Sequence, residues 1–124
     1  MRRAQQVKRG ELYWAKLAPR SGSEQTGRRP VIILSHDAFN ETPGWRSIIV
    51  VPVSTSITQA RRGPTVVSLA TGTAGLKSDS NAICHQVTTL DRAKLDARIG
   101  ALPPDLLAQI EQALLAALDI RRSS

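Results

Sequence analysis

The spacing of apolar and polar positions along the chain predicts a series of short strands. Stretches rich in β-branched and aromatic residues, bounded by Gly, Pro or Ser, occupy residues 11–17, 30–34, 48–53, 65–69 and 81–87, and the last could extend to Leu90. Residues 30–34 have no polar face, which is typical of a central strand buried on both sides. Pro52 lies inside the third stretch and predicts an edge strand or a bulge there.

Near the C-terminus the pattern changes from strand-like to helical spacing. Pro104 suits a first helical turn, and Asp105 complements the positive end of the helix dipole. The apolar residues that then recur at helical spacing are Leu106, Leu107, Ile110, Leu114, Ala117 and Leu118. One more helical turn is expected at residues 37–40, capped by Ser35 or Asp37. Together these elements predict a mainly β protein, a small barrel with an amphipathic C-terminal helix packed across it.

The 124 residues suffice for one domain. We expect that domain at residues 9–120, preceded by a disordered basic leader at 1–8 and followed by a short tail at 121–124. Aliphatic runs such as residues 48–51 are far shorter than the roughly 20 apolar residues of a membrane span. The leader lacks the apolar stretch of a signal peptide. We therefore expect a cytoplasmic protein that makes no use of a membrane.

The charge balance narrows the range of partners. Lys and Arg total 17 against 10 Asp and Glu, a formal net charge of +7, and most of the cations are Arg. Guanidinium groups match phosphate oxygens two at a time, so the bias points to nucleic acid. Codon usage in a GC-rich genome explains the same bias equally well. The single cysteine, Cys84, excludes an internal disulfide, and its apolar neighbours indicate a small buried side chain.

Familiar enzyme motifs are missing from the sequence. There is no HxxxH pair, Gly-rich phosphate loop or GxSxG string, and the acids are scattered, so no metal or cofactor is expected. Two features remain: Arg28 and Arg29 before Pro30 at a loop-to-strand junction, and hydroxyls beginning with Ser54 and Thr55 at a strand end. Each has an ordinary explanation, because arginines at strand starts are commonly solvated and hydroxyl clusters commonly end strands.

Longer strings show a resemblance. Residues 9–14 read RGELYW, residues 22–31 read GSEQTGRRPV, residues 51–55 read VPVST and residues 78–91 read SDSNAICHQVTTLD. With the closing helix, these strings resemble the MazF/PemK family of toxin endoribonucleases over residues 8–120. The resemblance implies an SH3-like (PemK/CcdB-type) β-barrel and a homodimer. It also implies the toxin of a type II toxin–antitoxin system, an mRNA interferase that cleaves single-stranded RNA without a metal and is neutralised by a cognate antitoxin.

The resemblance also implies site residues. The family's essential Arg before Pro falls on Arg29, and its essential Ser or Thr falls on Ser54, with Thr55 as the alternative. Its late Gln falls on Gln86. The residues expected to bind RNA are Glu24, Gln25, Thr26, Arg28, Arg61, Arg62, His85 and Gln86. Two departures bear on sequence preference: His85 replaces a position that is often acidic, and residues 59–63 form a basic insert in which the arginines either contact RNA or are simply solvated.

The chemistry is consistent with these residues. RNA carries its own nucleophile, the 2′-hydroxyl, so the enzyme need only align the attack and stabilise charge, leaving 2′,3′-cyclic phosphate and 5′-hydroxyl ends. Arg29 is suited to the charge and Ser54 to a hydrogen bond with the phosphate. The general base is open: His85 has a suitable pKa, but the alternative is a histidine of the barrel wall with its hydrogen bond satisfied.

Two other functions are compatible with the sequence. A toxin of the same fold could bind and poison DNA gyrase without cleaving nucleic acid, and a plain RNA-binding barrel is the third possibility. Arg29 together with Ser54 favours the nuclease, because a gyrase binder does not need this pair. The +7 charge predicts an acidic antitoxin.

Overall fold

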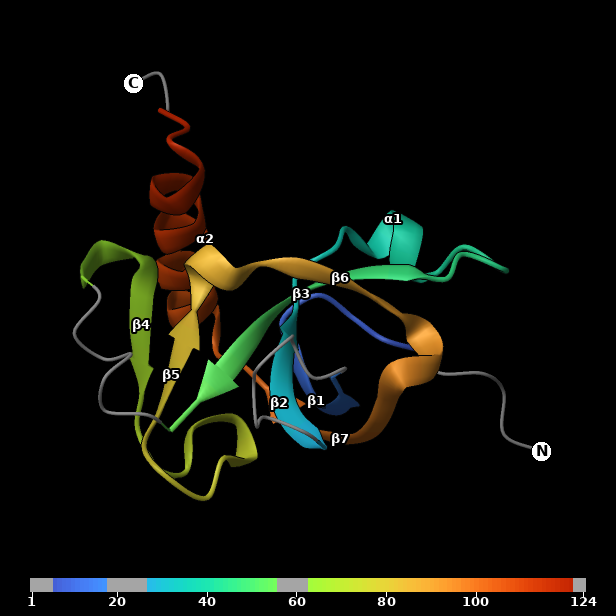
Figure 1. Ribbon diagram of the computed structural model, residues 1–124, viewed down its shortest axis with the longest axis horizontal. Helices are drawn as coiled ribbons and strands as arrows, with labels where there is room; N and C mark the ends of the chain where they lie inside the picture. Colours follow the sequence, from blue (N-terminus) through green and yellow to red (C-terminus); the bar gives the residue numbers. More distant parts are fainter. Residues whose placement is uncertain (1–5, 18–26, 56–62, 122–124) are drawn as a thin grey trace.

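The structure is a computed structural model that describes residues 6–17, 27–55 and 63–121. Within these residues the chain forms seven strands and two α-helices (Figure 1). In chain order they are β1 (Glu11–Lys16), β2 (Arg28–Ile33), α1 (Asp37–Asn40), β3 (Ser47–Ser54), β4 (Val66–Leu69), β5 (Ser80–Ile83), β6 (Thr88–Asp91), β7 (Leu95–Ala101) and α2 (Pro104–Leu118).

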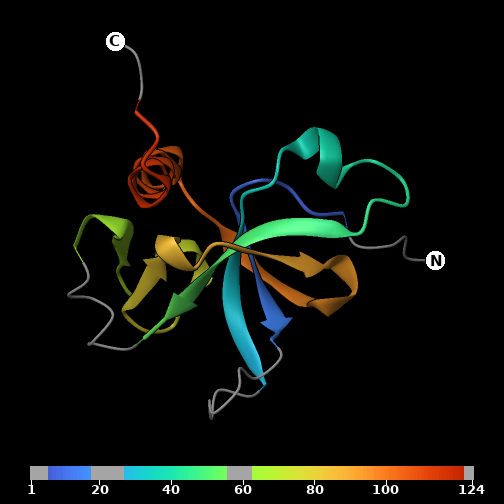
Figure 2. The same cartoon turned by 45° about the horizontal axis from the view of Figure 1, so that its top comes forward.

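The strands form one antiparallel sheet in the order β4-β5-β3-β2-β1-β7, and β6 pairs with β3 beside this path. The sheet bends strongly between β3 and β2, and α2 lies against its β4–β5 end (Figures 1 and 2). The mainly β fold with a C-terminal helix is confirmed. Within the described residues no ladder joins the two end strands, so the sheet is open and the word barrel applies only loosely.

Two of the seven strands were not expected. The stretch 81–87 was predicted as one strand, but β5 ends at Ile83 and the chain forms a 3₁₀ turn, η4 (Cys84–Gln86), before β6 begins. Strand β7 escaped prediction because charged side chains interrupt its apolar positions. It is nevertheless held in place by β1, with Tyr13 opposite Arg98.

Pro52 lies in an interior strand, but one of its two sides is locally an unpaired edge, in keeping with the expectation from sequence. It pairs with Val31 of β2 on one side. On the other side it falls between Val50, which pairs with β6, and Val53, which pairs with β5. The neighbouring segment forms η4 at this point. A residue without an N–H therefore sits where strand β3 changes partner, and a gap in the ladder is tolerated there.

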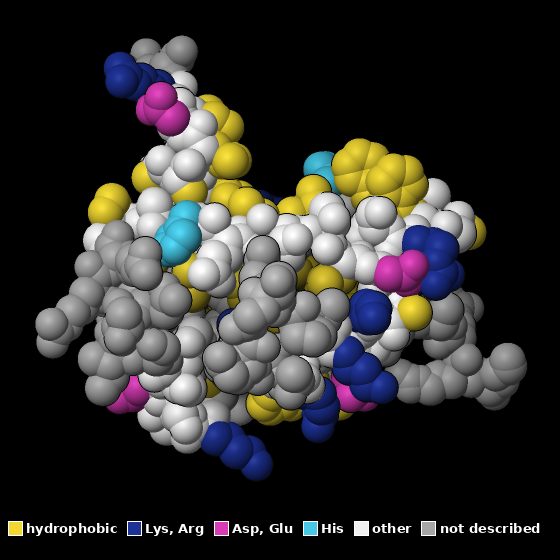
Figure 3. Space-filling view, in the orientation of Figure 1, with side chains coloured by type: hydrophobic (Ala, Val, Ile, Leu, Met, Phe, Trp, Pro, Cys, Tyr) yellow, Lys and Arg dark blue, Asp and Glu magenta, His cyan; other side chains and the backbone are white. Residues whose placement is uncertain are grey.

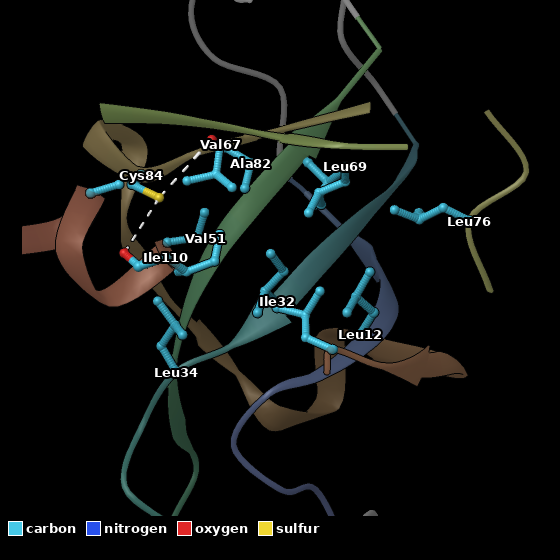
Figure 4. Close-up of a cluster of buried hydrophobic side chains, with 13 residues drawn as sticks. Leu12, Ile32, Leu34, Val51, Val67, Leu69, Leu76, Ala82, Cys84 and Ile110 are labelled. Carbon is cyan, nitrogen blue, oxygen red and sulfur yellow. Dashed lines mark hydrogen bonds between the residues drawn. The ribbon is translucent and has the colours of Figure 1, made fainter. Parts of the chain in front are cut away.

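Two apolar clusters pack on the two faces of the central strands. The first lies between the sheet and α2 and contains Leu12, Ile32, Leu34, Val51, Val53, Val67, Leu69, Leu76, Ala82, Cys84, Leu102, Ile110 and Ala113 (Figure 4). The second contains Val7, Tyr13, Ala15, Val31, Ile33, Ile48, Val50 and Leu95. Successive residues of β2 thus enter different clusters, which confirms a central strand buried on both faces, although β2 itself spans Arg28–Ile33 rather than 30–34.

The caps expected for the short helix α1 were wrong. His36 is the N-cap, and its Nδ1 accepts a hydrogen bond of 2.8 Å from the Ala38 N–H. The Ser35 hydroxyl instead donates to Asn40 Oδ1 inside the protein (2.6 Å). Asp37 accepts a hydrogen bond from the Arg9 backbone N–H (2.8 Å), which lowers the pKa of its carboxyl group. Asp37 therefore anchors the segment that contains Arg9, rather than capping the helix.

Residues 6–8, which precede the domain predicted at 9–120, make contacts with it. Of the predicted leader and tail, residues 1–5 and 122–124 lie outside the described residues. Val7, by contrast, is buried in the second cluster, and the Tyr13 hydroxyl donates to the Gln6 carbonyl (3.2 Å). The segment just before Arg9 is therefore part of the folded domain. In the described part of the chain, no helix has the length and apolar character needed to span a membrane.

Candidate active site

Arg29 and Ser54 flank the point where strands β2 and β3 separate. The last residues paired between these strands are Val31 and Pro52. Beyond that pair β3 continues with β5, through Val53 and Ser54, and the two ribbons diverge (Figures 1 and 2). Arg29 and Ser54 each lie two residues past the last pair, one on each of the diverging strands.

The two side chains belong to the same face of the sheet. Side chains alternate along a strand, so Arg29 follows Val31 and Ile33, which enter the second cluster. Ser54 follows Pro52 and Val50, and Val50 enters the same cluster. Both residues are half-buried. A guanidinium and a hydroxyl thus face the same side from two rigid strands.

Thr55 differs from Ser54 in placement. It lies one residue beyond the end of β3 and is exposed. Alternation assigns it to the opposite face, where Val51 and Val53 enter the first cluster. Between the two hydroxyl candidates, the geometry favours Ser54 as the partner of Arg29.

Arg28 and Arg29 are separated by the same alternation. The Arg28 guanidinium carbon lies 4.9 Å from the ring centroid of Trp14, and its Nε lies 3.1 Å from Asp96 Oδ2. Trp14 is on the β1 face that carries Leu12, a residue of the first cluster. Arg28 therefore points away from the face of Arg29 and Ser54.

Asn81 was not among the residues predicted for the site, but it lies beside Ser54. This residue of β5 pairs directly with Ser54 on one side and with Ser68 of β4 on the other. Only 8% of Asn81 is exposed, and the Ser68 hydroxyl donates a long hydrogen bond of 3.5 Å to its Oδ1. An asparagine inside the predicted strand 81–87 was the signal available, because strands are depleted in Asn.

His85 and Gln86 lie on η4, which contacts α2 and β3. His85 is exposed, and its Nδ1 lies 2.8 Å from the Thr65 hydroxyl. Gln86 is half-buried. The residue opposite Ser54 is Asn81, so the structure does not place His85 directly across from the candidate hydroxyl. His85 therefore has a hydrogen-bond partner, Thr65, as expected for the alternative in which this histidine is structural.

Five of the predicted RNA-binding residues lie outside the described residues: Glu24, Gln25, Thr26, Arg61 and Arg62. Among the residues that are described, no three His, Cys, Asp or Glu side chains gather as a metal site would require. The described side chains at the separation of β2 and β3 can therefore offer positive charge, a hydroxyl and an amide.

Most of the chain matches a known protein family. Residues 8–118 match the family described as PemK-like, MazF-like toxin of type II toxin–antitoxin system. The chain belongs to this family. The toxin prediction is thereby confirmed, and the match covers the whole sheet and α2.

Individual members of the PemK/MazF family support the assignment. Endoribonuclease MazF6 of Mycobacterium tuberculosis is 32% identical over 114 residues, which cover 92% of this chain and 98% of the relative. Endoribonuclease EndoA of Bacillus subtilis is 32% identical over 112 residues, 90% of this chain and 94% of the relative. The MazE–MazF crystal structure from Deinococcus radiodurans superposes with a TM-score of 0.71 at 27% identity, covering 94% of this chain and 99% of that one.

These comparisons decide between the functions left open by the sequence. The chain is an endoribonuclease of the PemK/MazF toxin family. The gyrase-binding alternative finds no support among them, since the relatives carry the name of a nuclease. The enzymatic prediction is therefore confirmed at the level of the reaction class.

Proposed function

We propose that this toxin cleaves single-stranded RNA, mRNA in the cell, through attack of the internal 2′-hydroxyl on the scissile phosphate, assisted by Arg29 and Ser54. The observation that carries the proposal is the common face of these two residues where β2 and β3 separate. The endoribonuclease names of the curated relatives support the substrate class. The 2′-hydroxyl is part of the substrate, so this reaction needs no hydroxide generated by a metal.

Arg29 supplies electrostatic stabilisation. As the 2′-oxygen attacks, negative charge grows on the non-bridging phosphate oxygens, and a fixed guanidinium lowers the barrier without having to reorganise. A guanidinium offers hydrogen-bond donors and no acceptor, so Arg29 is an unsuitable base. The Ser54 hydroxyl donates a hydrogen bond to a phosphate oxygen, and the strand on which Ser54 sits limits its motion.

Several candidate roles surround this pair. The exposed face of His85 is available to RNA, although its bond to Thr65 gives it a structural function as well. Gln86 follows on the same turn and is proposed to contact RNA. Glu24, Gln25, Thr26, Arg61 and Arg62 remain predicted RNA contacts. Arg28 is proposed to contact the RNA backbone beyond this pair, from the opposite face of β2.

We further propose that the protein is a cytoplasmic homodimer inhibited by an acidic antitoxin. The Deinococcus crystal structure is of MazE–MazF, two differently named proteins, which supports a protein partner. The net charge of +7 favours an acidic segment in that partner. Apolar side chains gather at the surface around α1, where Phe39 and Trp45 stack with centroids 5.0 Å apart while 46% and 42% exposed (Figure 3). Such a patch supports contact with another protein chain.

The test of the reaction uses matched RNA oligonucleotides in excess EDTA. One oligonucleotide is all-ribose, and the other carries a single 2′-deoxy nucleotide immediately 5′ of the mapped cleavage site. We expect cleavage of the first to 2′,3′-cyclic phosphate and 5′-hydroxyl ends, and no cleavage of the second. Efficient cutting of the deoxy substrate, or a 5′-phosphate on the product, means that water is the nucleophile and refutes the proposed mechanism.

A second experiment tests the antitoxin. Cleavage of the all-ribose oligonucleotide is followed while the purified antitoxin is titrated in. We expect activity to fall in proportion to complex formation, because an acidic segment competes with RNA for the same basic surface. A stoichiometric complex that cuts RNA at the full rate would contradict this occlusion.

A further inference from the structure

We propose that Asn81 is a positioning residue of the active site, which orients the Ser54 hydroxyl toward the RNA phosphate. The proposal rests on the proposed function of Ser54 and adds a residue that neither the family resemblance nor the comparisons assign. It follows from the row of side chains that the sheet places beside Ser54.

The row crosses three strands on one face. Ser68 of β4 pairs with Asn81 of β5, and Asn81 pairs with Ser54 of β3. Directly opposed side chains in an antiparallel sheet have Cβ atoms about 4.5–5.5 Å apart, within reach of a hydrogen bond between an amide and a hydroxyl. The intervening residues Val67, Val53 and Ala82 all enter the first cluster on the other face, so the three polar side chains share their own face.

Ser68 defines which way the Asn81 amide faces. Its hydroxyl donates to Asn81 Oδ1 at 3.5 Å, so the oxygen of the carboxamide is turned toward β4. The nitrogen of the same planar group is then turned the other way, toward β3 and Ser54. Asn81 is only 8% exposed, and a polar side chain at such a position is normally fully hydrogen-bonded and well ordered.

This orientation decides what Ser54 can do. A serine hydroxyl has one proton and two acceptor lone pairs. An amide N–H directed at the Ser54 oxygen occupies a lone pair and leaves the hydroxyl proton to point elsewhere. Arg29 lies on the same face across the separation of β2 and β3, and the phosphate that it stabilises is the acceptor on that side. Asn81 therefore acts through Ser54: it directs the Ser54 O–H so that the hydroxyl donates its hydrogen bond to the phosphate.

A double-mutant cycle tests this coupling. Single-turnover cleavage of the all-ribose oligonucleotide is measured for the wild type, Asn81→Ala, Ser54→Ala and the double variant. We expect Asn81→Ala alone to slow the step about tenfold, the scale of one well-placed hydrogen bond. In the Ser54→Ala background we expect the same change to slow it less than about twofold, because the hydroxyl to be oriented is gone. RNA affinity should change little in either case.

Two further variants separate positioning from folding. Asn81→Asp keeps the shape but replaces the N–H donor with a carboxylate oxygen, so the rate should fall at least as far as for Asn81→Ala. Ser80→Ala is the matched control: Ser80 is buried on the same strand, faces the opposite side and donates to the Ser78 carbonyl (2.9 Å). It should reduce the urea midpoint without changing the rate of the folded enzyme.

The outcomes are distinct. Equal losses from Asn81→Ala in both backgrounds, a rate for Asn81→Asp like that of the wild type, or equal rate losses from Asn81→Ala and Ser80→Ala would each overturn the positioning role. A wild-type rate for Ser54→Ala would instead refute the proposed function of Ser54 itself, and the Asn81 inference with it. A loss for Ser54→Ala with none for Asn81→Ala rejects only the inference.

Discussion

Arg28 and Arg29 are neighbours in sequence but lie on opposite faces of β2. Arg28 stacks over Trp14 at 4.9 Å and is paired with Asp96 at 3.1 Å. Arg29 shares the face of Val31 and Ile33, on the side where Ser54 lies. The alternation of side chains along β2 therefore places Arg29 on the face of Ser54 and Arg28 on the other face. Substitution of Arg28 is thus a control for substitution of Arg29.

Replacing Arg29 with Ala should reduce the rate of RNA cleavage by about 10²–10³, the usual cost of removing a fixed donor from a developing charge. Arg28→Ala should change the single-turnover rate less than about threefold, because Arg28 faces away from Ser54. Losing its exposed ion pair with Asp96 should lower the free energy of unfolding by at most about 1 kcal/mol. Single-turnover rates at saturating enzyme measure both effects on cleavage. A folded Arg29→Ala variant that cuts RNA normally would remove Arg29 from the site.

Ser54→Ala should slow cleavage about tenfold or more, whereas Thr55→Ala should stay within about twofold of the wild type. The reason is the alternation of the strand, which turns Ser54 and not Thr55 to the face of Arg29. The measurement is the same single-turnover assay, with circular dichroism to show that both variants are folded. If Thr55→Ala is the more damaging change, the catalytic hydroxyl lies one residue beyond the position we assign.

Arg9 connects three parts of the fold, and its loss should destabilise the protein. Its Nε donates to the Leu34 carbonyl at 2.9 Å and its Nη1 to Glu111 Oε2 of α2 at 2.7 Å. Arg9→Ala should lower the free energy of unfolding by about 1–2 kcal/mol, measured by urea denaturation. Glu111→Ala removes only the partly exposed ion pair and should cost less than about 1 kcal/mol. Equal losses in the two variants would show that the Leu34 bond contributes nothing.

The Cys84 thiol should be unreactive in the folded protein. Its side chain is fully buried, and this burial raises the pKa of the thiol to about 11, so almost no thiolate is present at pH 8. Native protein should therefore react with a disulfide reagent such as DTNB only at the rate of unfolding, and protein in 6 M guanidinium should react at once. Rapid stoichiometric labelling of the native protein would contradict this burial.

Much of the fold followed from local pattern. The β-branched run at residues 30–34 has no polar side chain, and in the structure Ile32 enters one cluster while Val31 and Ile33 enter the other. The helix α2 was predictable because its apolar spacing and first-turn proline are local signals. Strand β7 was not, because its place beside β1 depends on a partner more than 80 residues away in the chain.

The candidate site, like the fold, was only partly predictable from the sequence. Long strings such as GSEQTGRRPV were enough to identify the family and to make Arg29 and Ser54 candidates for the site. Three features became visible only in the folded chain: Arg28 faces away from the site, β3 changes partner at Pro52, and Asn81 lies opposite Ser54. The physical reason is that composition and periodicity report each segment's own preferences, whereas register is set by contacts between segments far apart in the chain. A shift of one residue in either ladder would turn these side chains to the opposite face.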